Sequence, residues 1–114
     1  MASAQFHVAT VGVNTVVAIK DSLTHLACED LQKIFNEVVS KARNKVVLDF
    51  KAVSSIDSQG LELLLAMHET LANSGGVLKM ACLNAACRDI LVVTRLINLF
   101  HVYADLPEAL RGEA

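Results

Sequence analysis

The sequence contains few of the motifs that mark catalytic, nucleotide-binding or metal-binding proteins. Its five glycines form no GxGxxG, GxxxxGKS/T or GxSxG pattern, so dinucleotide binding, a P-loop and a nucleophile elbow have no local support. Its three cysteines and four histidines include no CxxC and no HxxxH pair, although close ligand spacing is typical of zinc sites. We expect the cysteines to be reduced and mostly packed. The sequence therefore predicts neither a metal nor a cofactor.

Neither sign of charge dominates, and no apolar run is long. The formal net charge is −2 and the isoelectric point is about 6.0, which leaves no basic surface for nucleic acid and no polybasic patch for anionic lipid. The longest apolar runs hold about five residues, whereas a membrane-spanning helix needs about 20. The first ten residues also lack the basic and apolar regions of a signal peptide. We expect a cytoplasmic protein that binds no nucleic acid and does not insert into a membrane.

Apolar residues are nevertheless abundant. They make up 54% of the 114 residues, with a mean hydropathy of +0.45. A domain of this size cannot bury all of them, so part of the surplus is expected to form a docking surface or a self-association patch. A homodimer is therefore left open.

The spacing of apolar residues changes along the chain between strand-like and helix-like. Residues 6–11 and 13–19 are predicted to form a hairpin, and residues 46–50, 77–82 and 100–103 are predicted to form further strands. Helices are predicted from the series Leu31, Ile34, Phe35, Val38, Val39 and Ala42, from Asp57 to Gly75, after Asn84 with Ile90, Leu91 and Val93, and from Leu106. The order ββαβαβαβα is typical of an α/β fold with a mixed, mostly parallel β-sheet and covering α-helices. We expect a single domain over residues 1–114.

The stretch from Val46 to Leu65 is the centre of this pattern. Its first part, with Val46, Val47, Leu48 and Phe50, is apolar on both faces and predicts a central strand. Asp57 then suits a helix N-cap, because its carboxylate can accept from backbone N–H groups two or three residues on. Ser58 falls in the first helical turn with its hydroxyl pointing outward. The positive end of the helix dipole would stabilise a phosphate on this serine.

Plainer structural roles are available for the other polar residues. Asp57 and Glu62 could be read as an acid and base pair, but five residues apart on a helix they point to different faces. Ser58 as a nucleophile would need a base, and His68 lies too far along the same helix axis to act as one. His68 is expected at the edge of the core. The lysines at 45, 51 and 79 are expected to be flanking charges at strand ends.

The segment Val53 to Leu65, with its Asp57-Ser58-x-Gly60-Leu61 signature, resembles the STAS domains of the anti-sigma-factor antagonist family. The resemblance covers nearly the whole chain and includes the element order ββαβαβαβα. It implies that Ser58 is phosphorylated by a partner that is both a serine/threonine protein kinase and an anti-sigma factor, or by a related switch kinase, and that a phosphatase restores the serine. It also implies a binding module without catalytic activity of its own, which binds the partner while Ser58 is unphosphorylated.

The residues expected to contact the partner surround Ser58 in two segments. They are Ser22, Leu23, Thr24, Asp57, Gln59, Gly60 and Glu62. Two positions differ from the family pattern. Gln59 replaces a residue that is usually small, and Asp21 to Thr24 replaces a loop that commonly reads Gly-x-Leu-Asp.

Two alternatives stay open at this stage. The first is a soluble STAS subunit of a membrane lipid transporter of the ABC type, in which the same turn would face an ATPase subunit. The second is a hydrolase that uses Ser58 as its nucleophile, which labelling by a serine-directed fluorophosphonate would support.

Overall fold

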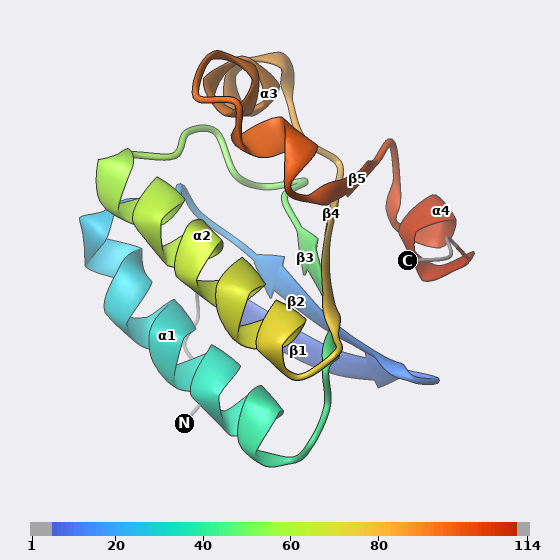
Figure 1. Cartoon of the computed structure of the whole chain (residues 1–114). Helices are drawn as coiled ribbons and strands as arrows, with labels where there is room; N and C mark the ends of the chain where they lie inside the picture. Colours follow the sequence, from blue (N-terminus) through green and yellow to red (C-terminus); the bar gives the residue numbers. More distant parts are fainter. Residues whose placement is uncertain (1–5, 112–114) are drawn as a thin grey trace.

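The computed structural model describes residues 6–111, in which helices pack around one five-stranded sheet (Figure 1). The elements are β1 (Phe6–Val11), β2 (Asn14–Ile19), α1 (His25–Ser40), β3 (Lys45–Asp49), α2 (Ser58–Asn73), β4 (Val77–Ala81), α3 (Ala85–Val93), the 3₁₀ helix η1 (Leu96–Asn98), β5 (His101–Tyr103) and α4 (Leu106–Arg111). Apart from η1, this is the predicted order, so the α/β fold is confirmed.

The strands follow one another across the sheet in the order β1-β2-β3-β4-β5. β1 pairs antiparallel with β2 through the hairpin, and the remaining neighbours pair in parallel. β3 is therefore the middle strand, and Val46, Val47 and Leu48 are each 0% exposed. The prediction of a central strand at this position is confirmed.

The two faces of the sheet are covered unequally. α1 and α2 lie side by side over one face and enclose the main core, which includes Leu48, Leu64 and Phe35 (Figure 1). α4 lies on the other face, over a small cluster of Val16, Val47, Ala81 and Ala109. Because the parallel strands β2, β3 and β4 lead into α1, α2 and α3, these three helices begin near the same edge of the sheet.

One detail of the predicted helices is wrong. Ala42 lies beyond α1, which ends at Ser40, and its φ of 60° is incompatible with helix continuation. In α3, Val93 lies within the helix as predicted, and it is 78% exposed because the helix turns Cys87 and Leu91 inward at i, i+4 spacing.

The prediction for Lys79 is also wrong. Lys79 lies inside β4 and is 3% exposed, since side chains alternate along a strand and this one points toward α4. Its Nζ donates to the carbonyl of Ala109, 3.0 Å away, and lies 5.8 Å from the centre of the Tyr103 ring. Lys79 is thus an anchor for α4, whereas Lys45 and Lys51 are exposed as predicted.

Candidate functional site

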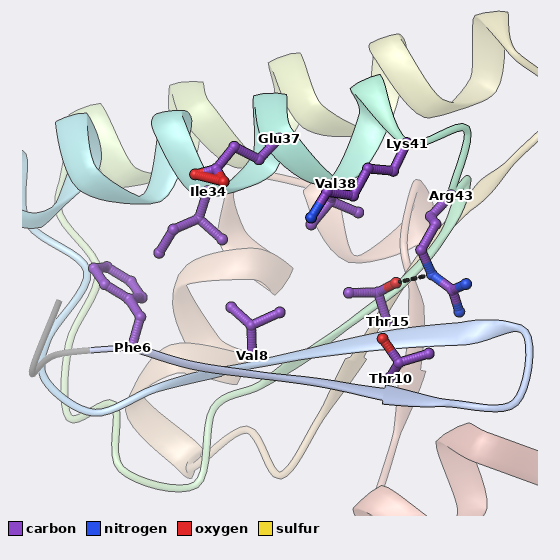
Figure 2. Close-up of a pocket in the computed structure, with 9 residues that line it drawn as sticks. All are labelled: Phe6, Val8, Thr10, Thr15, Ile34, Glu37, Val38, Lys41 and Arg43. Carbon is purple, nitrogen blue, oxygen red and sulfur yellow. Dashed lines mark hydrogen bonds between the residues drawn. The ribbon is translucent and has the colours of Figure 1, made fainter. Parts of the chain in front are cut away.

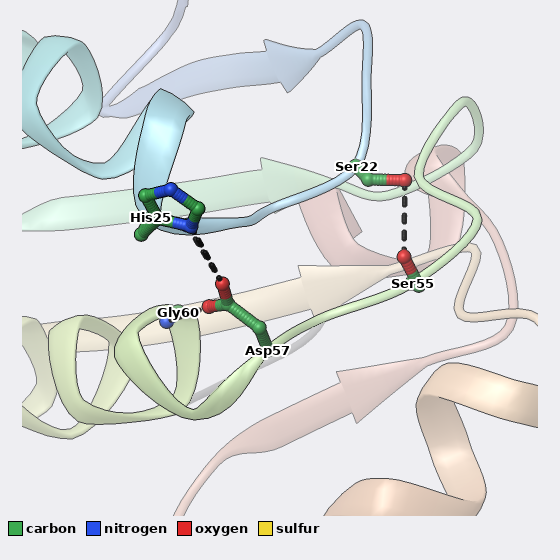
Figure 3. A network of polar contacts seen from close by, with 5 residues as sticks. All are labelled: Ser22, His25, Ser55, Asp57 and Gly60. Carbon is green, nitrogen blue, oxygen red and sulfur yellow. Dashed lines mark hydrogen bonds and ion pairs between the residues drawn. The ribbon is translucent and has the colours of Figure 1, made fainter.

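Asp57 joins the starts of two helices (Figure 3). As the N-cap of α2, it accepts a 2.8 Å hydrogen bond from the backbone N–H of Gly60 through Oδ1. Its Oδ2 accepts a second 2.8 Å hydrogen bond from the backbone N–H of His25, the first residue of α1. Thr24, the N-cap residue of α1, makes no capping bond with its own side chain. One carboxylate therefore caps both helices and fixes their first turns relative to each other.

The surroundings of Asp57 favour its charged form. The N–H of Gly60 contributes most to holding the pKa of Asp57 below its ordinary value, and the backbone N–H and imidazole of His25 act in the same direction against a smaller opposing effect of burial. The imidazole Nδ1 of His25 lies 3.6 Å from Oδ2. Asp57 is consequently ionised at neutral pH, directly before Ser58 in the chain.

Ser58 is the first residue of α2, and its side chain is exposed. Within residues 6–111 its hydroxyl has no hydrogen-bond partner. It lies at the positive end of the helix, where backbone N–H groups attract an anion. This is the location that the sequence predicted, and the hydroxyl is open to a second protein.

The segment before α1 is bound to the segment before α2. The N–H of Leu23 donates to Ser55 O at 2.9 Å, and the N–H of Asp57 donates to Leu23 O at 3.1 Å, as in a short parallel bridge. A Cβ added to Gly60 would lie 2.5 Å from Leu23 O, so only glycine permits this approach. Leu23 is 0% exposed and Gly60 is buried. Both residues therefore lie beneath the expected docking surface instead of on it, and they position it.

Hydroxyl groups hold the same two segments together at their outer side. Ser55 Oγ donates to Ser22 Oγ at 3.1 Å, as Figure 3 shows. The Oγ atoms of Ser22 and Ser54 are 2.7 Å apart. Ser22 and Thr24 are partly exposed. Gln59 and Glu62 are exposed on the first turns of α2. The structure thus gathers Ser22, Thr24, Asp57, Ser58, Gln59 and Glu62 around the start of α2.

Two residues of this region were missed by the sequence reasoning, His25 and Leu26. Both begin α1, and Leu26 is 78% exposed. The signal for Leu26 was available, because a leucine at this position falls outside the helical series of Ala27, Leu31, Phe35 and Val38 that faces the core. The contact of His25 with Asp57 had no local signal, since 32 positions separate the two residues.

His25 places an imidazole near Asp57, but Ser58, His25 and Asp57 do not form a catalytic triad. Among the described residues no hydrogen bond joins Ser58 to His25, whereas an activated serine needs a base within hydrogen-bond reach. His68, the histidine considered from the sequence, is partly buried and packs edge-on against Phe100 with ring centres 5.6 Å apart. Its predicted place at the edge of the core is confirmed.

A groove of about 250 Å³ lies elsewhere, between α1 and the hairpin (Figure 2). Its floor is apolar, with Phe6, Val8, Ile34 and Val38, and Arg43 closes one end by donating from Nε to Thr15 Oγ1 at 2.7 Å. None of the residues expected to contact a partner lines it. The candidate site therefore lies outside this groove, at the starts of α1 and α2.

The cysteines are packed as the sequence predicted. Cys87 is buried, Cys28 and Cys82 are partly buried, and burial raises the pKa of each thiol. Separately, none of the helices in residues 6–111 has the length and hydropathy to span a bilayer.

Comparison with known proteins agrees with this geometry. The sequence model of the STAS domain family matches residues 5–109. A Thermotoga maritima protein with the provisional name anti-sigma factor antagonist is 29% identical over 77 residues, which are 68% of each chain.

Solved structures show the same fold. A crystal structure from Thermotoga maritima, of a protein with the same provisional name, has a TM-score of 0.88 at 24% identity and covers 94% of this chain and 92% of its own. An anti-sigma factor antagonist from Mycobacterium paratuberculosis has a TM-score of 0.83 at 24% identity, covering 96% of each chain. The anti-sigma factor antagonist SpoIIAA in its unphosphorylated form has a TM-score of 0.71 at 18% identity, covering 92% of this chain and 93% of its own.

Proposed function

The chain belongs to the STAS domain family, and from this membership we propose that it is a cytoplasmic anti-sigma-factor antagonist controlled by phosphorylation of Ser58. In its unphosphorylated form it binds an anti-sigma factor that is also a serine kinase. Phosphorylation of Ser58 releases this partner, and a phosphatase restores binding. The chain itself contributes a docking surface and an acceptor hydroxyl, but no catalysis.

One observation carries the proposal: an exposed, unbonded serine hydroxyl at a helix start that Asp57 holds rigidly. A kinase can reach this hydroxyl without unfolding any element. In the transfer, Ser58 Oγ forms a bond to the γ-phosphorus of the partner's ATP and gives its proton to a base of the partner, while the bond to the β-phosphate oxygen breaks and ADP leaves. The other serines nearby, Ser54 and Ser55, bond with Ser22 and precede the helix, so a phosphate there would lie outside the helix N-terminal field.

The phosphate can act as a switch because the free energy of placing it at the start of α2 is low in the free domain and high in the complex. It adds about −1.5 to −2 charges, which the start of α2 tolerates in water. In the complex the group would face the phosphates of the bound nucleotide. Two like charges about 4 Å apart repel by roughly 4 kcal/mol at an effective dielectric near 20. This corresponds to about a thousandfold loss of affinity.

Titration calorimetry against a purified kinase-type anti-sigma factor from the same organism tests the proposal. We expect wild type and Ser58→Ala to bind alike, Ser58→Asp to bind at least about tenfold more weakly, and the phosphoprotein to bind most weakly, because aspartate carries one charge instead of nearly two. The melting temperature should change little in each case. Equal affinities of the wild type, Ser58→Asp and the phosphoprotein would contradict the switch.

Phosphopeptide mapping after incubation with the same kinase and ATP provides the matched control. Ser54→Ala and Ser55→Ala should still accept the phosphate, whereas Ser58→Ala should not. A phosphate mapped mainly to Ser54 or Ser55 would show that Ser58 is not the acceptor.

A further inference from the structure

Leu26 is an apolar side chain in a position that does not serve the fold. It is the second residue of α1 and 78% exposed, while the buried face of the helix is formed by Ala27, Leu31, Phe35 and Val38. Single exposed leucines are common on protein surfaces, so exposure alone assigns no role. Its surroundings distinguish it from the others.

The helix starts that carry Leu26 and Ser58 are joined by a hydrogen bond from a backbone N–H to a side-chain carboxylate. The N–H of His25, which directly precedes Leu26, donates to Asp57 Oδ2 at 2.8 Å. Asp57 directly precedes Ser58. α1 and α2 run side by side with their first turns together (Figure 1). The starts of α1 and α2, which carry Leu26 and Ser58, are therefore held together, although 32 positions separate the two residues in the sequence.

The first two turns of α1 and of α2 carry acidic side chains and no lysine or arginine. Residues 25–32 of α1 contain Glu29 and Asp30 but no lysine or arginine, and α2 contains Glu62 and Glu69 but no lysine or arginine along its whole length. Glu29 and Glu62 are exposed, and Asp57 is ionised between the two helices. A complementary protein surface would place basic side chains against these carboxylates and an apolar pocket against Leu26.

We propose that Leu26 is the apolar anchor of the docking surface around Ser58, inserted into an apolar pocket of the kinase-type partner, with Glu29 and Glu62 facing basic residues at the pocket's rim. This inference rests on the proposed function and extends its surface from α2 and the loops onto α1. The basic rim lies outside the nucleotide site, so it does not remove the repulsion that a phosphate on Ser58 experiences there. Leu26 thus contributes binding affinity in the unphosphorylated state, and phosphorylation of Ser58 controls whether the partner stays bound.

The chain offers a matched control for Leu26. Val93 on α3 is also a large apolar side chain that is 78% exposed. We expect Leu26→Ala to weaken binding to the purified kinase-type anti-sigma factor by about 10- to 100-fold, the range for withdrawing one buried aliphatic side chain from an interface. Val93→Ala should bind as the wild type does. Both variants should keep the wild-type melting temperature, because neither side chain is buried.

A second pair of variants tests the acidic residues that are proposed to face the basic rim of the partner's pocket. Glu29→Lys should lower the association rate several-fold and reduce its dependence on salt. Glu69→Lys makes the same charge change on α2, eleven residues beyond Ser58 and about 16 Å along the helix axis, and should have little effect.

Two failures can be told apart. If Leu26→Ala binds as tightly as the wild type while Ser58→Asp still binds weakly, the anchor is refuted and the proposed function stands. If Ser58→Asp also binds as the wild type does, the proposed function fails, and the anchor fails with it.

Discussion

The starts of α2 and α3 have the same local geometry and differ in what they present to the outside. Each helix follows a parallel strand, and each is capped by a side chain that accepts from the N–H three residues on. Asp57 accepts from Gly60 at 2.8 Å, and Asn84 accepts from Cys87 at 2.7 Å. The difference therefore does not arise from the capping bond itself.

The difference lies in the second polar atom of each cap and in the residue that follows. The second carboxylate oxygen of Asp57, Oδ2, accepts from the N–H of His25 in α1. The next residue, Ser58, is exposed and carries a hydroxyl. The amide nitrogen of Asn84 donates to Val53 O at 3.1 Å, and Ala85 comes next without a polar group. Thus α3 holds the loop that leads to α2, while α2 presents a charged and modifiable surface. The comparison teaches that a helix start acquires a function from its surroundings and not from its cap.

The largest effect on stability is expected from Gly60→Ala. The added Cβ would lie 2.5 Å from the backbone oxygen of Leu23, which cannot move without breaking the bridge between the two segments. We expect a loss of roughly 3 kcal/mol in the free energy of unfolding, at the upper end for overpacking. Urea unfolding measures it. Gln59→Ala, in the same turn but exposed, should cost almost nothing, and an equally stable Gly60→Ala would show that the contact is not needed.

A smaller effect, on binding alone, is expected from a charge at the first helical residue. Ser58→Asp and Ala85→Asp place the same carboxylate at the same position of two capped helices. Each helix dipole should tolerate it, so the melting temperatures should stay close to that of the wild type. Calorimetry should show at least about tenfold weaker partner binding for Ser58→Asp, or about 1.4 kcal/mol, and no change for Ala85→Asp. Equal weakening by both would point to a non-specific effect of charge.

Giving α3 the cap residue of α2, an aspartate in place of Asn84, should lower the stability of the fold. Asn84→Asp keeps the oxygen that caps α3 but removes the N–H donor to Val53 O, and a carboxylate beside a carbonyl oxygen is repelled. We expect a loss of about 1 kcal/mol, the usual net value of one hydrogen bond, measured by urea unfolding at neutral pH. Asn84→Ser preserves a capping oxygen without the charge and serves as the control. A stability equal to that of the wild type would mean that the Val53 contact contributes nothing.

The smallest effect concerns acid stability. Because hydrogen bonds lower the pKa of Asp57 in the folded protein, its contribution is present above the ordinary pKa of aspartate, about 3.9, and is lost as pH falls through the lower, folded value. The difference in melting temperature between the wild type and Asp57→Asn should therefore shrink between neutral pH and strongly acidic pH. Asn84 does not ionise, so the difference in melting temperature between the wild type and Asn84→Ala should not change through titration of the cap. A constant difference for Asp57→Asn would show that its charge does not stabilise the fold.

Much of the fold and part of the site could be predicted from the sequence, because the relevant interactions are local. The spacing of apolar residues located the strands and helices, and the order of these elements predicted the mostly parallel sheet. The uninterrupted apolar run at residues 46–50 predicted that β3 is central. The caps Asp57 and Asn84 were found because each bonds to an N–H three residues further along. Ser58 was placed at an exposed helix start for the same reason, and its phosphorylation stays a prediction.

The remaining features depend on contacts between residues far apart in the sequence. Only the packed chain brings His25 to Asp57, sets Leu23 against Gly60, and turns Lys79 inward to the carbonyl of Ala109. A helical pattern shows which face of a helix is apolar, but it does not show which residues of the folded protein that face or the opposite face will contact. The sequence therefore determined that α2 begins directly after Asp57. The tertiary structure decided that the same carboxylate also holds the first residue of α1, because a hydrogen bond across 32 positions forms only after the sheet aligns the two helix starts.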